Sequence, residues 1–202
     1  MHRDSHHARI INGDDVRLRN GHSGKYMEIK GAIDADSTVV QQYPFNGGAN
    51  QIWKLVKDKE GTYRIYTKLG SKTRVLDVKR LGTTDGTPIQ IYTPNDSDGQ
   101  RFILEYAGGD AYRIVPKHAP HMALAPTGGS QGNSIPVVLK TKNTAAKDQL
   151  WYFEDPGVMT SEAPKAGETF HIRNRMSGKN FDVNLALTAD NTPLLQGIHN
   201  GR

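Results

Sequence analysis

The stretch QQYPFNGGANQIWKL, residues 41–55, places a glutamine two residues before a tryptophan. The same Gln-x-aromatic spacing returns in GQRFIL, with Gln100 before Phe102, and in DQLWYF, with Gln149 before Trp151. The aromatic therefore recurs at positions 53, 102 and 151, a constant step of 49 residues. A fixed step of this length indicates an internal structural repeat.

The composition favours an all-β domain. The chain has 202 residues, of which 36% are hydrophobic and 23% charged, and it contains 21 glycines and 10 prolines. These turn formers separate short apolar runs with alternating patterns, such as Tyr63 and Ile65 or Leu76 and Val78, which is typical of strands with one buried face. The sequence has no cysteine, which excludes disulfides, thiolate metal sites and a cysteine nucleophile.

The charge and the lengths of the apolar runs argue against nucleic acids and membranes as partners. The net charge is +5, and the basic residues are scattered instead of forming a stripe, so nucleic-acid binding is not expected. No apolar run is long enough to insert into a membrane. Residues 1–15 lack the apolar core of a secretory signal. We therefore expect a cytoplasmic protein, export without a standard signal, or a piece of a larger protein.

Each repeat contains four short apolar runs separated by turn residues. One unit of about four strands cannot bury its apolar face alone, so the three copies must close around a common core. We expect a barrel capped by hairpins, in which Trp53, Phe102 and Trp151 meet and each bury roughly 150–250 Å². The glutamines before them are expected to satisfy backbone groups where the strands bend.

The signatures resemble those of ricin-B-type β-trefoil lectins and related carbohydrate-binding modules. The resemblance rests on the three Gln-x-aromatic pairs, on LDV at 76–78 with IQIY at 89–92, and on YPFNGGANQIW at 43–53. It covers about residues 14–155 and implies a β-trefoil lectin without catalytic activity or cofactor. Its expected partners are glycans, most often galactose-type sugars. One shallow site per repeat is implied, with a carboxylate, an aromatic ring and an amide around the sugar.

The second repeat fits the family site best. Its candidate sugar-binding residues are Asp77, Gln90, Tyr92 and Gln100. Gly99 stands where the family usually has asparagine, and Asp98 or Asn95 could substitute for it. The alternative is structural: Asp77 would cap a turn and Tyr92 would be a half-buried strand residue.

The other two repeats depart from the pattern. The first repeat has the candidate residues Glu28, Tyr43, Asn50 and Gln51, and the longer glutamate displaces the carboxylate oxygens. In the third repeat, the step of 49 with shifted loops puts Leu124 at the carboxylate position and Thr141 at the aromatic position. The third repeat is therefore not expected to bind sugar in the family manner.

The C-terminal tail resembles the beginning of a further repeat. Residues 168–201 align without gaps on residues 14–47, and 12 positions are identical. Asp182 takes the carboxylate position, but Gly197 replaces the aromatic, so no sugar site is expected there. The tail stops before its Gln-x-aromatic pair, so we expect it to belong to a tandem trefoil or to dock on the first barrel or another chain, as in a swapped dimer or other homo-oligomer. The expected organisation is an N-terminal arm (1–13), a trefoil (14–155), a linker (156–167) and an incomplete fourth repeat (168–202).

Three motifs for other functions are weaker. GGSQG at 128–132 matches a nucleophile elbow, but it precedes a strand instead of a helix and is expected to be a loop. The N-terminal histidines His2, His6 and His7 and the pair His118 and His121 do not come with both the third ligand and the second-shell acceptor that a dedicated site requires, so no metal is expected. The acidic residues do not form a facing pair for glycoside hydrolysis, so an enzyme is not expected.

Two alternative functions remain open at this point. The chain could be the sugar- or receptor-targeting module of a larger toxin or glycoside hydrolase. It could also be a β-trefoil protease inhibitor or another protein-binding module, in which case the loops would act instead of the face that carries Asp77 and Tyr92.

Overall fold

The computed structural model describes residues 13–157 and, in the C-terminal part, the backbone strands over 169–173, 180–187 and 193–200. The chain divides into two units, Met1–Met159 and Thr160–Arg202. The N-terminal histidines and most of the predicted linker lie outside the described residues. No helix in the described part is long and apolar enough to cross a membrane.

The first unit consists of three repeats of four strands, which confirms the all-β prediction. The strands are β1 (Asp15–Asn20), β2 (Tyr26–Ile29), β3 (Thr38–Tyr43), β4 (Trp53–Lys57), β5 (Tyr63–Thr67), β6 (Val75–Val78), β7 (Ile89–Tyr92), β8 (Phe102–Gly108), β9 (Ala111–Pro116), β10 (Met122–Pro126), β11 (Ile135–Thr141) and β12 (Trp151–Glu154). In each repeat a short 3-10 turn follows the second strand and another precedes the fourth: η2 (Lys30–Ala32), η3 (Ala49–Gln51), η4 (Lys79–Leu81), η5 (Asp98–Gln100), η6 (Thr127–Gly129) and η7 (Lys147–Gln149).

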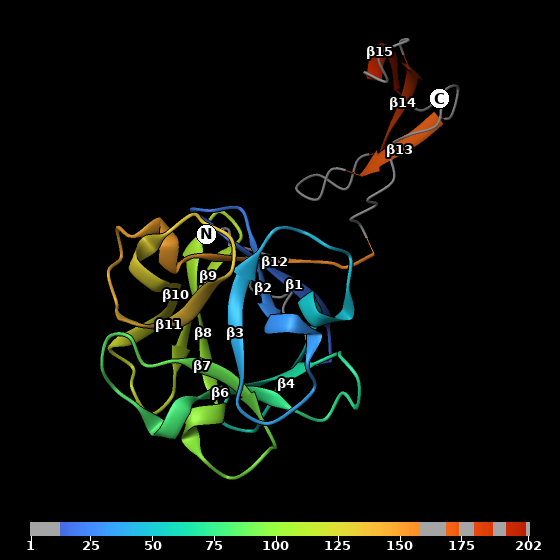
Figure 1. Ribbon diagram of the computed structural model, residues 1–202. Helices are drawn as coiled ribbons and strands as arrows, with labels where there is room; N and C mark the ends of the chain where they lie inside the picture. Colours follow the sequence, from blue (N-terminus) through green and yellow to red (C-terminus); the bar gives the residue numbers. More distant parts are fainter. Residues whose placement is uncertain (1–12, 158–168, 174–179, 188–192, 201–202) are drawn as a thin grey trace. The chain divides into compact units, whose positions relative to one another are not determined.

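The outer strands of the three repeats close a six-stranded barrel (Figure 1). Strand β1 pairs with β4 and β12, β5 pairs with β4 and β8, and β9 pairs with β8 and β12, all antiparallel. This cycle of pairings leaves none of these six strands as a free sheet edge, so the repeats stabilise one another.

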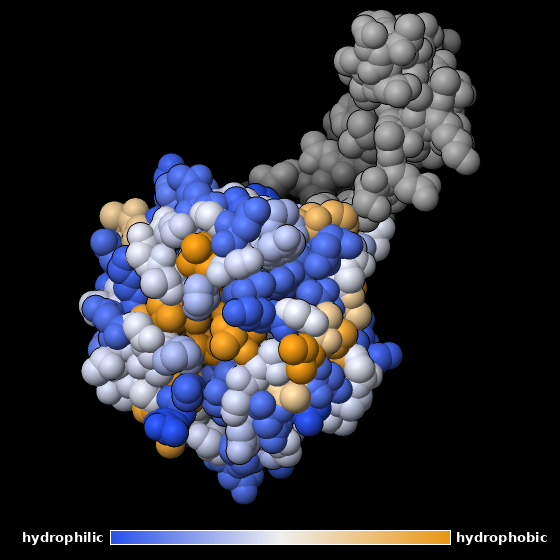
Figure 2. Space-filling model, in the orientation of Figure 1, coloured by the Kyte–Doolittle hydropathy of each residue, from blue (hydrophilic) through white to orange (hydrophobic). Residues whose placement is uncertain are grey.

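The inner strands of the repeats form three hairpins, β2–β3, β6–β7 and β10–β11. The hairpins meet through β3, which pairs with β7 and β11, and through a bridge between Pro88 and Val138. On the face shown in Figure 2, hydrophobic side chains gather near the centre of a largely hydrophilic surface, over β3, β7 and β11. The barrel and its hairpin cap together make the β-trefoil.

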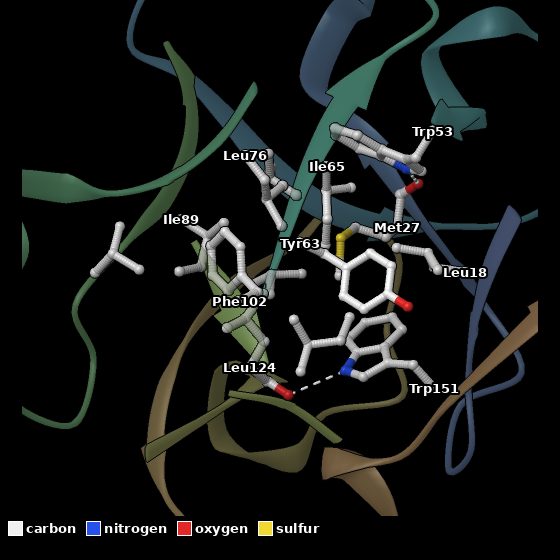
Figure 3. Packing of buried hydrophobic residues seen from close by; sticks show 14 of the residues in the cluster. Leu18, Met27, Trp53, Tyr63, Ile65, Leu76, Ile89, Phe102, Leu124 and Trp151 are labelled. Atoms are coloured by element: carbon white, nitrogen blue, oxygen red, sulfur yellow. Dashed lines mark hydrogen bonds between the residues drawn. The ribbon is translucent and has the colours of Figure 1, made fainter. Parts of the chain in front are cut away.

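The three repeat aromatics are fully buried in one core cluster (Figure 3). The indole Nε1 of Trp53 donates to the Met27 carbonyl at 3.1 Å, and that of Trp151 donates to the Leu124 carbonyl at 3.0 Å. Phe102 has no N–H group and contributes by packing alone. The aromatics are therefore core residues, as the repeat predicts, and two of them also fix the strand that carries their carbonyl partner.

The described strands of the second unit form one antiparallel sheet in the order β13 (Thr169–Arg173), β14 (Asn180–Leu187) and β15 (Pro193–Asn200). This is the strand order of β1, β2 and β3 in the first repeat. Asp182 and Gly197 lie on β14 and β15, and their side chains are outside the described residues. The assignment of 168–202 to a fourth repeat stays a prediction.

We predict that Trp151→Phe destabilises the first unit by about 1–3 kcal/mol, because the buried Leu124 carbonyl loses its partner. Urea unfolding followed by circular dichroism measures the change. Tyr152→Phe, on the half-buried neighbouring residue, is the matched control and should shift stability by less than about 0.5 kcal/mol. Equal effects of the two changes would contradict a stabilising role for the indole hydrogen bond.

Candidate functional site

The glutamine before each core aromatic is buried and binds the backbone of its own repeat. The side-chain carbonyl of Gln51, Gln100 or Gln149 accepts from one backbone N–H, and the amide donates to one backbone carbonyl. Gln51 binds the Asn46 N–H and the Pro44 carbonyl, and Gln100 binds the Asn95 N–H and the Thr93 carbonyl. Gln149 binds the Asn143 N–H and the Thr141 carbonyl, and all six distances are 2.8–3.1 Å. These bonds tie the end of the third strand to the start of the fourth, which is the turn role predicted from the sequence.

In the second repeat the side-chain amide of Gln100 also binds a carboxylate, that of Asp77. Asp77 and Gln90 face each other across β6 and β7, and the Gln90 amide donates to Asp77 Oδ1 at 3.0 Å. The Gln100 amide donates to Asp77 Oδ2 at 2.9 Å. Tyr92 lies two residues after Gln90 on the same face of β7 and is half-buried. The structure therefore brings all four predicted residues of this repeat together.

The Asp77 carboxylate lies in a poorly hydrated position. Its exposed fraction is 7%, and burial raises the pKa of this carboxyl above its ordinary value of 3.8, although the Gln100 and Gln90 amides favour the ionised form. A carboxylate offers about four acceptor positions, and among residues 13–157 two amides donate to Asp77. Each oxygen therefore accepts from one amide and has a second acceptor position without a donor among these residues.

The first repeat has the same arrangement with more amides around the carboxylate. The Gln41 amide donates to Glu28 Oε2 at 2.8 Å. Oε1 of Glu28 accepts from Gln51 at 3.1 Å, Asn46 at 3.3 Å and Asn50 at 3.4 Å. Asn46 was not among the residues predicted from the sequence, although Asn95 occupies the same place in the second repeat. The Glu28 carboxylate is therefore more fully occupied by the protein than Asp77 is.

The predicted aromatic residue of the first repeat is exposed. Tyr43 is the last residue of β3 and has an exposed fraction of 37%. It pairs across the hairpin with Tyr26, two residues before Glu28, so ring and carboxylate lie on the same face. Asn50 and Gln51 thus bind the Glu28 carboxylate, and Tyr43 lies on the same face of the hairpin.

The third repeat lacks both key groups, but the residues at these positions differ from those predicted. Leu124 is a core residue whose carbonyl binds Trp151, as Met27 does for Trp53. The residue that matches Asp77 is therefore Ala125, which pairs with Val138 on the next strand. The third repeat therefore has no carboxylate at the position of Asp77.

The aromatic position of the third repeat is also one residue away from the predicted Thr141. The Thr141 carbonyl accepts from Gln149 as the Thr93 carbonyl does from Gln100. Lys140 therefore stands where the second repeat has Tyr92. Compared with the second repeat, the third repeat has one residue fewer before Ala125 and one residue more between Lys140 and Gln149. The two changes cancel, so the step of 49 between the core aromatics is kept.

Neither residue suggested as a substitute for the missing asparagine in the second repeat reaches Asp77. Asn95 Oδ1 accepts from the Ser97 N–H at 2.8 Å. The Asp98 carboxylate lies 3.9 Å from Arg101 and 3.7 Å from Lys117. In the second repeat, therefore, Gly99 stands beside Gln100 and no other side-chain amide takes the place of the asparagine.

The end of strand β7 that bears Tyr92 is fixed by the preceding repeat. Asp36, in the turn before β3, accepts from the Thr93 N–H at 2.8 Å and from its hydroxyl at 2.9 Å. Arg74 binds Asp36 at 2.9 Å and Asp34 at 2.7 Å. This contact between repeats positions the tyrosine and could not be derived from the step of 49 alone.

The other motifs that the sequence suggested have structural roles in the described part of the chain. The GGSQG segment forms η6 and a turn, in which Ser130 Oγ accepts from the Gly132 N–H, and β11 follows it. His118 Nε2 donates to the Gly82 carbonyl at 2.8 Å. Within the described residues, no group of three or more histidine, cysteine or acidic side chains is arranged to hold a metal ion.

Comparison with known proteins identifies a family. The model of the family described as ricin-type beta-trefoil lectin domain-like matches residues 9–92, 70–140 and 98–197. Flavastacin from Elizabethkingia meningoseptica is 34% identical over 115 residues, which are 57% of this chain and 26% of that protein. The chain thus spans about a quarter of the length of this relative.

Solved structures show the same fold. The designed threefold-symmetric protein ThreeFoil matches with a TM-score of 0.66 and 28% identity, over 70% of this chain and 98% of its own. The ricin B-like lectin of Macrolepiota procera, solved in complex with lactose, matches with a TM-score of 0.59 and 20% identity, over 72% of this chain and 98% of its own.

We predict that Gln149→Leu destabilises the first unit by about 1–2 kcal/mol, because the Asn143 N–H and the Thr141 carbonyl lose the buried side chain that binds them both. Thermal and urea unfolding measure the effect. Gln131→Leu makes the same change on an exposed glutamine and should be nearly neutral. Equal stability of the two variants would contradict a stabilising role for the Gln149 hydrogen bonds.

Proposed function

The chain belongs to the ricin-type β-trefoil lectin-like family, and from this premise we propose that it is a non-catalytic carbohydrate-binding protein whose main site is in the second repeat. The observation that carries the proposal is the Asp77 carboxylate, held by Gln90 and Gln100 with one acceptor position free on each oxygen. A carboxylate placed in this way can accept from two adjacent sugar hydroxyls through charge-assisted hydrogen bonds.

Tyr92 supplies the second element of the proposed site. A flat ring matches the apolar C–H face of a pyranose, and the Asp36 contact to Thr93 holds the end of the tyrosine strand. Asp77 and Tyr92 contact different faces of a sugar, so together they define its orientation.

Galactose-type sugars are the proposed ligands. The family resemblance implies them, and the Macrolepiota procera lectin was solved with lactose, a disaccharide that contains galactose.

The first repeat is proposed as a second and weaker site. Glu28 and Tyr43 lie on one face, but four amides already donate to the carboxylate. A shallow site of this kind with a millimolar Kd contributes only about −4 kcal/mol, so useful affinity for a cell surface or polysaccharide would come from several sites acting together. We propose no sugar site in the third repeat, where Ala125 and Lys140 replace the two key groups.

Residues 168–202 are proposed to be a further trefoil-type repeat after a linker. The ungapped alignment on residues 14–47 and the matching strand order of β13, β14 and β15 support this assignment. Such a unit needs partner repeats to bury its apolar face, and a second copy of the chain could supply them in a swapped homo-oligomer.

A targeting module of a larger protein is the second candidate function. It is favoured by the match to Flavastacin, in which the aligned segment makes up 26% of the protein. In this case the trefoil would bind glycans in the same way and direct a further domain to them.

We predict that Asp77→Ala lowers the affinity for galactose-type glycans at least about tenfold, because charge-assisted bonds to two hydroxyls are lost. Glu28→Ala should reduce binding only in part. A glycan array followed by titration calorimetry with galactose and lactose measures both effects.

Asp96→Ala is the matched control for these variants, because Asp96 is an exposed acidic residue close to the second site and its removal changes the net charge equally. It should leave binding unchanged. Circular dichroism checks that each variant is folded. Full binding by the folded double variant of Asp77 and Glu28 would reject the assigned faces, and an empty array would favour a protein-binding module.

Binding should also depend on pH through Asp77. The ionised carboxylate accepts the sugar hydroxyls, and burial raises its pKa above 3.8, so affinity is expected to fall on acidification at a higher pH than for an ordinary aspartate. Titrations of sugar between about pH 7 and pH 4 test this, with circular dichroism at each pH. Constant affinity in the folded protein down to the ordinary aspartate range would contradict the role of the ionised Asp77.

A further inference from the structure

The turn after β3 contains an asparagine that is followed by a glycine. The dipeptide Asn-Gly occurs twice between residues 13 and 157, as Asn20–Gly21 and as Asn46–Gly47. Asparagine is a thermolabile residue, because the next backbone nitrogen can attack the carbonyl carbon of its side chain. Glycine hinders this attack least, since it has no side chain and is conformationally permissive.

The fold protects the first of these two pairs. Asn20 is fully buried, and its amide donates to the Asp148 carbonyl at 2.9 Å. The N–H of Gly21, which carries the attacking nitrogen, donates to the Leu150 carbonyl at 2.8 Å. Both reacting groups of this pair are therefore held in other contacts.

The second pair lacks this protection. Asn46 and Gly47 are exposed, and in the described part of the chain the Gly47 N–H makes no hydrogen bond. Asn46 Oδ1 accepts from the Gly48 N–H at 2.8 Å. This hydrogen bond draws electrons away from Asn46 Cγ, the carbon that the Gly47 nitrogen would attack.

The other two repeats provide a comparison within the same chain. In every repeat the asparagine Oδ1 accepts from the N–H two residues later, at 2.8 Å for Asn46 and Asn95 and at 3.0 Å for Asn143. The next residue is Asp96 in the second repeat and Thr144 in the third. Their side chains shield the neighbouring nitrogen, so the first repeat alone combines this turn with a glycine.

We infer that Asn46 deamidates spontaneously and that this modification weakens the proposed sugar site of the first repeat. The Gly47 backbone nitrogen loses its proton and bonds to Asn46 Cγ, and the side-chain amino group takes up the proton and leaves as ammonia. Water then opens the cyclic imide to an aspartate or an isoaspartate. The effect on sugar binding rests on the proposed function, whereas the modification does not.

Either product disturbs the contacts around Glu28. The Asn46 amide donates to Glu28 Oε1 at 3.3 Å, and a carboxylate in its place cannot donate and repels the Glu28 carboxylate. An isoaspartate also lengthens the backbone of the turn, in which the Asn46 N–H donates to Gln51 at 3.1 Å. The carboxylate and its amide donors are therefore displaced together.

Peptide mapping by mass spectrometry follows the reaction in the folded chain over several days in mildly alkaline buffer. The change from amide to carboxylic acid should appear at Asn46 at least about tenfold faster than at Asn95 or Asn143, a barrier difference of about 1.4 kcal/mol. Asp96→Gly should raise the rate at Asn95 about tenfold, and the reciprocal Gly47→Asp should lower the rate at Asn46 by a similar factor. Equal rates at the three asparagines, or unchanged rates in both variants, would overturn the inference.

Titration with lactose in an Asp77→Ala background measures the first site by itself. Asn46→Asp should lower the affinity of this site at least about fivefold. Asn143→Asp adds the same charge at the equivalent position of the third repeat and should leave the affinity unchanged, with circular dichroism as the check on folding.

Equal affinities of the Asn46→Asp and Asn143→Asp variants would overturn the effect on binding. If the Asp77→Ala protein bound no lactose at all, the first repeat would have no site to weaken, and its proposed function would fail as well. The mass measurement decides the deamidation in either case.

Discussion

The buried glutamine two residues before each core aromatic is the contact on which the rest of this structure depends. Its side chain satisfies one N–H and one carbonyl in the turn between the third and fourth strands. Without it the turn would lose two hydrogen bonds, which contribute about 0.5–1.5 kcal/mol each. Because the turn leads directly into the aromatic, the same bonds set where Trp53, Phe102 and Trp151 enter the core.

The glutamine also explains how a repeat can lack the carboxylate and keep its fold. Its amide carries two N–H groups, of which one binds the backbone in all three repeats. The other binds a carboxylate where one exists, as between Gln100 and Asp77. In the third repeat Gln149 keeps both backbone bonds although Ala125 offers no acceptor. The carboxylate is therefore an addition to a turn that is already complete, and the repeats are free to diverge at this position.

The fold could be predicted from the sequence because it depends on the spacing of the aromatics and on alternation along the strands. The step of 49 found the core aromatics, whereas Asp77, Gln90 and Tyr92 were named from the family resemblance, and the pairing of β6 with β7 brings them onto one face. The third repeat was misaligned by one residue, since compensating length changes in two loops leave the step intact; only the burial of Leu124 and its bond to Trp151 reveal Ala125. The role of Asn46 and the left-handed turn at Leu81 depend on local backbone geometry, which residue patterns do not specify.

The second repeat combines three features that disfavour its own stability. It buries a carboxylate whose pKa is raised by desolvation, and it holds Arg80 and Leu81 in a conformation that suits glycine. Its core aromatic, Phe102, lacks the indole hydrogen bond that Trp53 and Trp151 make. The neighbouring repeats supply the compensating contacts, through Asp36 on one side and His118 on the other. Because the barrel is closed, the other two repeats hold the second repeat in place in spite of these three features, and a segment that would not be stable alone keeps a buried carboxylate.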